Sequence, residues 1–270
     1  INYVQFSSTG NATDFGDDNL AREEGYATFA SHTRGCLAGG YISPGNTSNI
    51  AYVTISSQGG VSDFGDLNVA ASRNVGLSDS TRGISAGGAD PTNNIISYVT
   101  IASTGNSTDY GDLTVAKYGS GACASPTRGL IAGGNPNTNI IDYITIQTKG
   151  NAETFGNLTD DPNHLAGCSN STRGLFGGGQ NPSNVDVIAY VTIATLGDAI
   201  DFGNLEDATD YLGACASATR GVFGGGQTPT KLDTIQYVTI ATTGNTVDFG
   251  NLTVARRFCM GLSDCHGGLG

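Results

Sequence analysis

The chain has 270 residues, of which 24 are acidic and 12 basic, so its formal net charge at pH 7 is −12. Apolar residues make up 38% of the chain and charged residues only 13%, so there is enough apolar material for a core, and general disorder is excluded. The acidic balance argues against nucleic acid as a partner, because sequence-independent binding to nucleic acid depends on basic patches.

The ends, the apolar runs and the cysteines bound the class of protein further. The chain begins at Ile1 without an initiator Met or a signal peptide, so we expect residues 1–270 to be one domain excised from a longer chain. The longest mainly apolar run, Val187 to Leu196, is ten residues long and too short to span a bilayer, so no membrane insertion is predicted. Six cysteines are too few for a disulfide-stapled scaffold, which favours folding in a reducing cytoplasm.

Three short phrases recur along the whole chain. The phrase I-x-Y-[VI] returns every 45 to 49 residues, at Tyr3, Tyr52, Tyr98, Tyr143, Tyr190 and Tyr237. The phrase [DT]-[FY]-G returns at Phe15, Phe64, Tyr110, Phe155, Phe202 and Phe249. The phrase T-R-G returns at Arg34, Arg82, Arg128, Arg173 and Arg220, and its sixth copy has decayed to His266-Gly267. Self-similarity at this period indicates a repeat architecture.

One unit, residues 213–255, divides into four strand-like runs. They are Gly213–Ser217, a run ending at Gly224-Gly225-Gly226, Ile235–Ala241 and Val247–Leu252. Gly, Pro and Asn punctuate the unit too often for helices, and no helical period is sustained. Four short strands per unit of about 45 residues are typical of a β-propeller blade. We therefore predict an all-β fold, a six-bladed propeller with four antiparallel strands per blade.

The side-chain sizes agree with this geometry. The first run of the unit holds only small residues, as the crowded innermost strand of a blade requires. The Tyr and Phe of the third and fourth runs are large enough to fill the wide outer gaps between blades.

These residues resemble kelch repeats. The resemblance rests on the small first strand, the Gly-Gly doublet ending the second, the Tyr in the third and a base after the fourth, and it covers all six units. The chain departs from the family in having no Trp, with the Phe or Tyr of the D-F-G phrase in that packing role. The regular Gly-, Thr- and Asn-rich array also resembles kelch-like proteins of marine bacteriophages, which implies a virion or tail-fibre component at a virion surface or outside the cell.

The ends of the chain are expected to share one blade. Aligning Tyr3 with Tyr237, and His266 with Arg220, separates the two ends by the equivalent of one loop between second and third strands. The last blade would combine two C-terminal with two N-terminal strands, which closes the ring and removes free sheet edges.

The repeated charges have two interpretations. The T-R-G arginines and a set of acids in the D-F-G phrase are expected on one face of the ring. One interpretation is a ring of arginines that binds anionic glycans; the favoured one is a structural Arg–Asp pair repeated in each blade, because binding groups rarely recur identically around a ring. The acids are Asp14, Asp63, Asp109, Asp201 and Asp248.

Deviation from the repeat points to another candidate site. After the fourth strand most units carry a base, whereas units four and five carry the acids Asp160, Asp161, Asp207 and Asp210. Several carboxylates suit Ca²⁺ or a cationic ligand, although no D-x-D-x-D-G loop is present. A solvated acidic edge is the alternative. The cysteines show no C-x-x-C spacing, so apart from this calcium site no cofactor or metal is predicted.

Enzyme chemistry has little support in the sequence. The chain has only three histidines and none of the G-x-S-x-G, H-E-x-x-H or phosphate-loop motifs. We therefore expect a non-catalytic module that presents loops to surface glycans, or to neighbouring subunits or domains of a larger assembly. The alternatives are a carbohydrate-active enzyme that uses Asp161 and Asp210, and a kelch-type adaptor for protein interactions.

Overall fold

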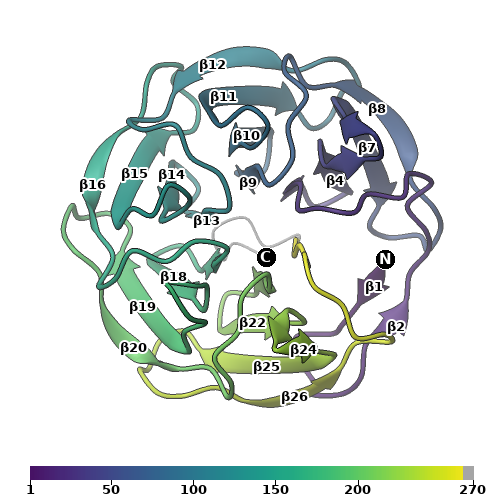
Figure 1. Cartoon of the computed structure of the whole chain (residues 1–270). Coiled ribbons are helices and arrows are strands. Elements are labelled where there is room, and N and C mark those ends of the chain that lie inside the picture. Colours follow the sequence, from purple (N-terminus) through teal and green to yellow (C-terminus); the bar gives the residue numbers. More distant parts are fainter. Residues whose placement is uncertain (264–270) are drawn as a thin grey trace.

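The computed structural model describes residues 1–263, and all of their regular elements are β-strands. The described residues include no helix long and apolar enough to cross a membrane. Five antiparallel four-stranded sheets stand around a common axis as the blades of a propeller (Figure 1). The predicted all-β propeller is therefore confirmed at this level.

The five blades, I to V, follow one another in chain order, and the first strand of each lies nearest the axis (Figure 1). Their strands are β3 (Ala27–Ala30), β4 (Arg34–Ala38), β7 (Asn49–Thr54) and β8 (Ser62–Asp66) in blade I; β9 (Val75–Ser78), β10 (Arg82–Gly88), β11 (Asn93–Thr100) and β12 (Thr108–Asp112) in blade II; β13 (Gly121–Ala124), β14 (Arg128–Ala132), β15 (Ile140–Thr145) and β16 (Glu153–Asn157) in blade III; β17 (Ala166–Ser169), β18 (Arg173–Gly177), β19 (Val187–Thr192) and β20 (Ile200–Asn204) in blade IV; and β21 (Gly213–Ala216), β22 (Arg220–Gly224), β25 (Thr234–Thr239) and β26 (Val247–Asn251) in blade V.

Three two-stranded sheets complete the described strands. Two are short hairpins in the loops between the second and third strands of blades I and V. They are β5 (Tyr41–Ile42) with β6 (Gly45–Asn46), and β23 (Gln227–Thr228) with β24 (Thr230–Lys231). The third pairs β1 (Asn2–Tyr3) with β2 (Thr13–Asp14).

The apolar core lies between blades rather than at the axis. Between blades II and III, for example, buried Ile84 and Tyr110 share one cluster with Ile131 and Ile144. The repeated tyrosine meets the aromatic ring of the D-F-G phrase edge to face in every unit, with ring centroids 6.0 Å apart for Tyr52 and Phe64 in blade I. Such a pair adds about 0.5–1.5 kcal/mol beyond its buried area. The expected role of these rings as outer wedges is thus confirmed.

Small residues on the innermost strands are required by close approach of the blades. A Cβ atom on Gly167 of β17 would lie 2.5 Å from the carbonyl oxygen of Ala122 in β13. Cross-bridges then tie these strands together: Ser169 donates from Oγ to Ala124 O at 2.7 Å.

A buried ion pair joins blades II and III. Lys117 Nζ lies 3.0 Å from Asp142 Oδ2, and both side chains are fully buried. The contact is ionic rather than a well-aligned hydrogen bond, and the carboxylate also accepts from Thr114 Oγ1 at 2.5 Å. Burial lowers the pKa of Lys117, although Asp142 opposes this shift. Lys117, one of the bases that follow a fourth strand, is therefore part of the packing.

The prediction of six four-stranded blades was wrong, because residues 1–263 form five. The sixth sector of the ring holds only the β1–β2 sheet on the outside and the irregular segment 252–263 on the inside (Figure 1). No strand pairing joins the two within the described residues, so they do not make one sheet. The sixth T-R-G copy, His266-Gly267, lies outside the described residues.

The ring is nevertheless closed at this sector. Gly10 N donates to Phe249 O in blade V at 2.7 Å, and Gly59 N of blade I donates to Phe15 O at 2.9 Å. On the inside, Thr28 of blade I donates from Oγ1 to Gly261 O at 2.8 Å. The N-terminal sheet thus makes the same backbone contacts to its neighbours that the blades make to one another.

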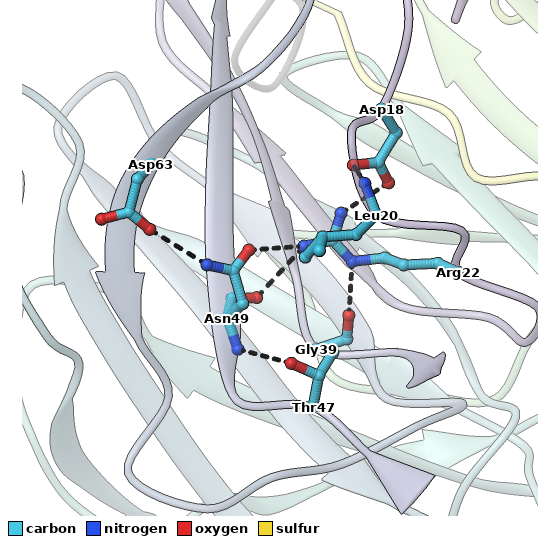
Figure 2. A network of polar contacts seen from close by, with 7 residues as sticks. All are labelled: Asp18, Leu20, Arg22, Gly39, Thr47, Asn49 and Asp63. Carbon is cyan, nitrogen blue, oxygen red and sulfur yellow. Dashed lines mark hydrogen bonds and ion pairs between the residues drawn. The ribbon is translucent and has the colours of Figure 1, made fainter. Parts of the chain in front are cut away.

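Arg22 anchors the N-terminal sheet to blade I (Figure 2). Its buried guanidinium pairs with Asp18 at 2.5 Å and donates to Gly39 O at 2.8 Å and to Asn49 Oδ1 at 2.8 Å. Asn49 in turn donates to Asp63 Oδ1 at 3.0 Å. Hydrogen bonds to charged groups are worth about 1.5–3 kcal/mol each, so this network fixes the connection between the two.

Candidate functional site

The T-R-G arginines have partners other than the repeated acids. Each donates from Nη1 to a backbone carbonyl in the next sector of the ring, as Arg128 does to Ile193 at 2.8 Å, and stacks over the tyrosine of its own blade, as Arg128 does over Tyr143 at 4.8 Å. The same contacts are made by Arg34, Arg82, Arg173 and Arg220. These side chains bind blade to blade.

The repeated acids lie apart from these arginines. Asp14, Asp63, Asp109, Asp201 and Asp248 are all exposed in β2 or in the fourth strands. Within residues 1–263 none forms an ion pair with a T-R-G arginine. An Asp–Arg bond is therefore not what makes the two phrases recur together.

The four acids of units four and five are distributed over two kinds of position. Asp160 and Asp207 are exposed, whereas Asp161 accepts a hydrogen bond from Asn181, and Asp210 accepts one from Asn184 at 3.2 Å. Asp210 is only 1% exposed, and burial raises its pKa. Among the residues described, no three His, Cys, Asp or Glu side chains are grouped to hold a metal ion. A calcium site here stays a prediction.

The strongest deviation from the repeat lies at one end of the axis. We define the axial mouth as Gly25, Arg73, Gly119, His164, Tyr211 and Phe258, the residues that lead into the innermost strands and, at the end, into segment 259–261. This end is opposite the T-R-G turns, which follow the same strands.

The backbone of the axial mouth is the same from blade to blade. The N–H of His164 donates to Gly119 O at 2.6 Å, and the N–H of Tyr211 donates to His164 O at 3.1 Å. Arg73 and Gly119 continue this belt of bonds around the axis. The φ angles are positive and nearly equal, 54° to 63° from Arg73 to Phe258, although only one of these five residues is Gly. Non-glycine residues seldom adopt this conformation, and it persists where the surroundings impose it.

Four of the six positions of the axial mouth carry different side chains and the other two are Gly25 and Gly119, and three of the side chains pack against one another as tilted rings. The His164 and Tyr211 ring centroids lie 4.2 Å apart, and those of Tyr211 and Phe258 lie 4.3 Å apart. Tyr118 extends the series, with its centroid 6.0 Å from that of His164. The axial mouth therefore has an aromatic wall along blades III to V and the C-terminal segment.

Two arginines lie close to the aromatic wall of the axial mouth. Arg73 pairs with Glu24 at 2.7 Å and lies over the Tyr118 ring at 5.6 Å. Arg257 lies over the Phe258 ring at 5.2 Å and donates from Nη1 to Gln227 Oε1 at 3.0 Å. Of these two cations, only Arg73 forms an ion pair within the described residues.

His164 is an uncharged, unpartnered ring. Burial, with a further contribution from the Arg73 charge, lowers its pKa to about 4. Neither ring nitrogen has a hydrogen-bond partner in the protein. Arg73 Nε and Asn74 Oδ1 are unpartnered as well. A buried polar atom without a partner costs about 1–3 kcal/mol, so these four atoms lower the stability of this end of the ring.

A cavity of about 70 Å³ lies inside the axial mouth. Its wall includes Arg73, Asn74, His164, Tyr211 and Phe258. A second cavity of about 90 Å³ lies deeper along the axis and is lined by the small residues of the innermost strands. None of the four acids of units four and five lines either cavity. The enzyme alternative that uses Asp161 and Asp210 stays a prediction.

Sequence reasoning missed this site. Arg73 is one of the bases that follow the fourth strands, but it was not connected with His164 at the equivalent position of another unit. The available signal was the position two residues before each first strand, which carries Gly, Arg, Gly, His and Tyr in successive blades.

The chain matches no protein-family model and no curated protein. The functional argument therefore rests on the geometry of the axial mouth.

Proposed function

We propose that this propeller is a non-catalytic recognition module that binds glycans at its axial mouth. One observation carries the proposal: at equivalent positions of the mouth, the repeated backbone from Arg73 to Phe258 presents four different side chains, those of Arg73, His164, Tyr211 and Phe258. Binding groups are expected to vary over a constant frame, because a repeated structural role would keep the residue constant. An aromatic wall with a few convergent polar groups over a cavity is the usual composition of a ligand site.

The non-catalytic part of the proposal is supported by the state of the reactive groups. Burial raises the pKa of the Cys36 and Cys123 thiols to about 12, so they are poor nucleophiles at neutral pH. His164 stays uncharged at pH 7 and has no carboxylate partner to orient it as a base. A virion or tail-fibre setting and a kelch relationship stay predictions that rest on the resemblance alone.

A glycan array with the purified module tests the proposal. The wild type is compared with Y211A, which removes the ring that lies between His164 and Phe258. D248N changes an exposed residue on an outer strand and is the matched control. We expect binding without turnover that is lost in Y211A and kept in D248N. A silent array, or equal binding by all three proteins, overturns the proposal.

The same array decides on the acidic alternative. The D160A/D207A variant and an EDTA wash are added as separate arms. Loss of binding in these arms, with Y211A unaffected, would move the site to the acids of units four and five.

A further inference from the structure

The residues that line the axis alternate between consecutive units. One position of the innermost strands carries a Cβ atom in blades I, III and V and is Gly in blades II and IV, and segment 252–263 continues the series with Gly. Two residues further on, Ala alternates with Ser in the same way. The first position is Thr28, Gly76, Ala122, Gly167, Ala214 and Gly261, and the second is Ala30, Ser78, Ala124, Ser169, Ala216 and Ser263. The axis therefore repeats every two units, although the strands repeat every unit.

The alternation makes two kinds of junction between blades. At the I–II junction a Cβ atom on Gly76 would lie 2.3 Å from Thr28 O, so the two backbones touch there. Gly167 and Ala122 make the same approach at the III–IV junction. At II–III and IV–V the second strand carries Ala122 or Ala214 in place of that Gly. Its Cβ atom excludes the same close approach.

Serine bridges follow the same division. Ser78 Oγ accepts from Ala30 N at 3.1 Å and donates to Ala30 O at 3.0 Å. Ser169 Oγ accepts from Ala124 N at 3.1 Å and donates to Ala124 O at 2.7 Å. Within residues 1–263, no hydrogen bond joins the innermost strands at II–III or IV–V. Blades I and II, and blades III and IV, are thus joined at the axis as pairs.

The contacts farther from the axis do not distinguish the junctions. The bond from Gly197 N to Phe155 O at III–IV has its equivalent in the bond from Gly244 N to Phe202 O at IV–V. The T-R-G arginines cross both junctions as well, through Arg128 and Arg173. The difference between the junctions therefore lies at the innermost strands.

We infer that the ring opens between pairs of blades, at II–III and IV–V, before it opens within a pair. Parts of a fold that are held by fewer contacts open at a lower free energy than the rest. This inference does not depend on glycan recognition. It has a consequence for the axial mouth, because the rings of His164 and Tyr211 pack across the IV–V junction and are separated when that junction opens.

Two buried thiols report on the two kinds of junction. Cys123 and Cys168 occupy the same position of β13 and β17, and each is 5% exposed. A Cβ atom on Gly174 of blade IV would lie 2.6 Å from Cys123 Sγ, and one on Gly221 of blade V would lie 3.0 Å from Cys168 Sγ. Burial raises the pKa of both thiols, so neither is reactive in the closed ring. Cys123 becomes accessible when III–IV opens, and Cys168 when IV–V opens.

The test is the initial rate at which iodoacetamide labels each cysteine in the folded full-length protein at pH 8. Peptide mass spectrometry gives the two rates, and each is divided by the rate in urea-unfolded protein. Cys168 should be labelled at least about tenfold faster than Cys123, since the serine bridge holds only the junction of Cys123. Equal rates, or faster labelling of Cys123, overturn the inference.

Two serine variants form a matched pair. S169A removes the bridge at III–IV and should raise the labelling rate of Cys123 about tenfold. S78A removes the equivalent bridge at I–II and should leave that rate within about twofold of wild type. Equal effects of the two variants on Cys123 would show that labelling follows global unfolding, which overturns the inference. An unchanged Cys123 rate in S169A overturns it as well.

Discussion

The imidazole of His164 lies directly over Gly119 of the neighbouring repeat. A Cβ atom on Gly119 would come within 2.7 Å of the His164 Cδ2 atom. The two residues occupy the same position of two consecutive units, with φ of 63° and 56°. Gly119 therefore contributes no side chain to the mouth, and the His164 ring of the next unit occupies that space.

The pH dependence of stability reports on this ring. The pKa of His164 is about 4 in the folded chain, against an ordinary value of 6.5. Between these values the unfolded chain binds more protons, so the free energy of unfolding should fall as the pH is lowered from 6.5 to 4. H164F should remove part of this fall. Phe is suitable because Phe258 has the same φ of 56° at the equivalent position. Thermal unfolding of both proteins from pH 7 to pH 4 checks this, and identical pH profiles would contradict it.

Two glycines allow a matched pair of substitutions: Gly111 belongs to the [DT]-[FY]-G phrase of blade II, and Gly150 lies in the loop between β15 and β16 of blade III. Gly111 and Gly150 have φ of 152° and 154°, so Ala is strained equally at both. A Cβ on Gly111 would lie 2.5 Å from the Gly150 carbonyl carbon, whereas a Cβ on Gly150 meets nothing within 4 Å. G111A should therefore cost about 1–3 kcal/mol more than G150A, the range for overpacking a close contact. Urea denaturation measures the difference, and equal losses would show that the blades can move apart.

The T-R-G arginine should act on stability rather than on binding. R128Q removes the bond to Ile193 O and the stacking over Tyr143. A loss of about 1.5–3 kcal/mol is expected from the charged hydrogen bond alone. D109N, an exposed change in β12, should stay within about 0.5 kcal/mol of wild type. Denaturation curves and the glycan array together decide the matter: a stable R128Q that has lost ligand would support the anion-binding ring.

The Lys117–Asp142 pair should show strong coupling. K117M leaves a buried carboxylate without its cation, a change that costs about 3–5 kcal/mol in buried pairs. D142S alone should cost less, because the lysine pKa is already lowered and the amine can lose its proton. The K117M/D142S double variant should be more stable than K117M, since the neighbouring unit has the uncharged residues Ala71 and Ser97 at the equivalent positions. A double-mutant cycle by denaturation measures this, and additive losses would contradict it.

Much of the frame could be predicted from the repeat alone. The expected runs Gly213–Ser217 and Val247–Leu252 correspond to β21 (Gly213–Ala216) and β26 (Val247–Asn251), each within one residue. Such agreement is possible because the strand pattern depends on neighbouring residues and recurs in each unit of the sequence. The partner of Arg128 could not be predicted in this way. Every residue has a backbone carbonyl, so the residue type does not indicate which carbonyl accepts the hydrogen bond.

The site was harder to predict for the opposite reason. Repetition directs attention to residues that stay constant, whereas four of the six positions of the axial mouth carry different side chains. Arg73 and His164 became neighbours of one cavity only when the ring placed equivalent residues around one axis. Within residues 1–263 no sixth four-stranded sheet forms, because segment 252–263 makes isolated contacts in place of a strand ladder.

The closure of the ring has a consequence for how the protein is made. Asn251 N donates to Asn11 Oδ1 at 3.1 Å across 240 residues of sequence, whereas the equivalent bond from Asp66 N to Asn106 Oδ1 between blades I and II spans 40 residues. Contacts so distant in sequence form late, since the chain must first lose the entropy of a long loop. During synthesis the contacts between the β1–β2 sheet and blade V can form only after blade V has left the ribosome. A destabilised blade anywhere in the chain would prolong that exposure, so the yield of folded protein depends on the slowest unit rather than on the average one.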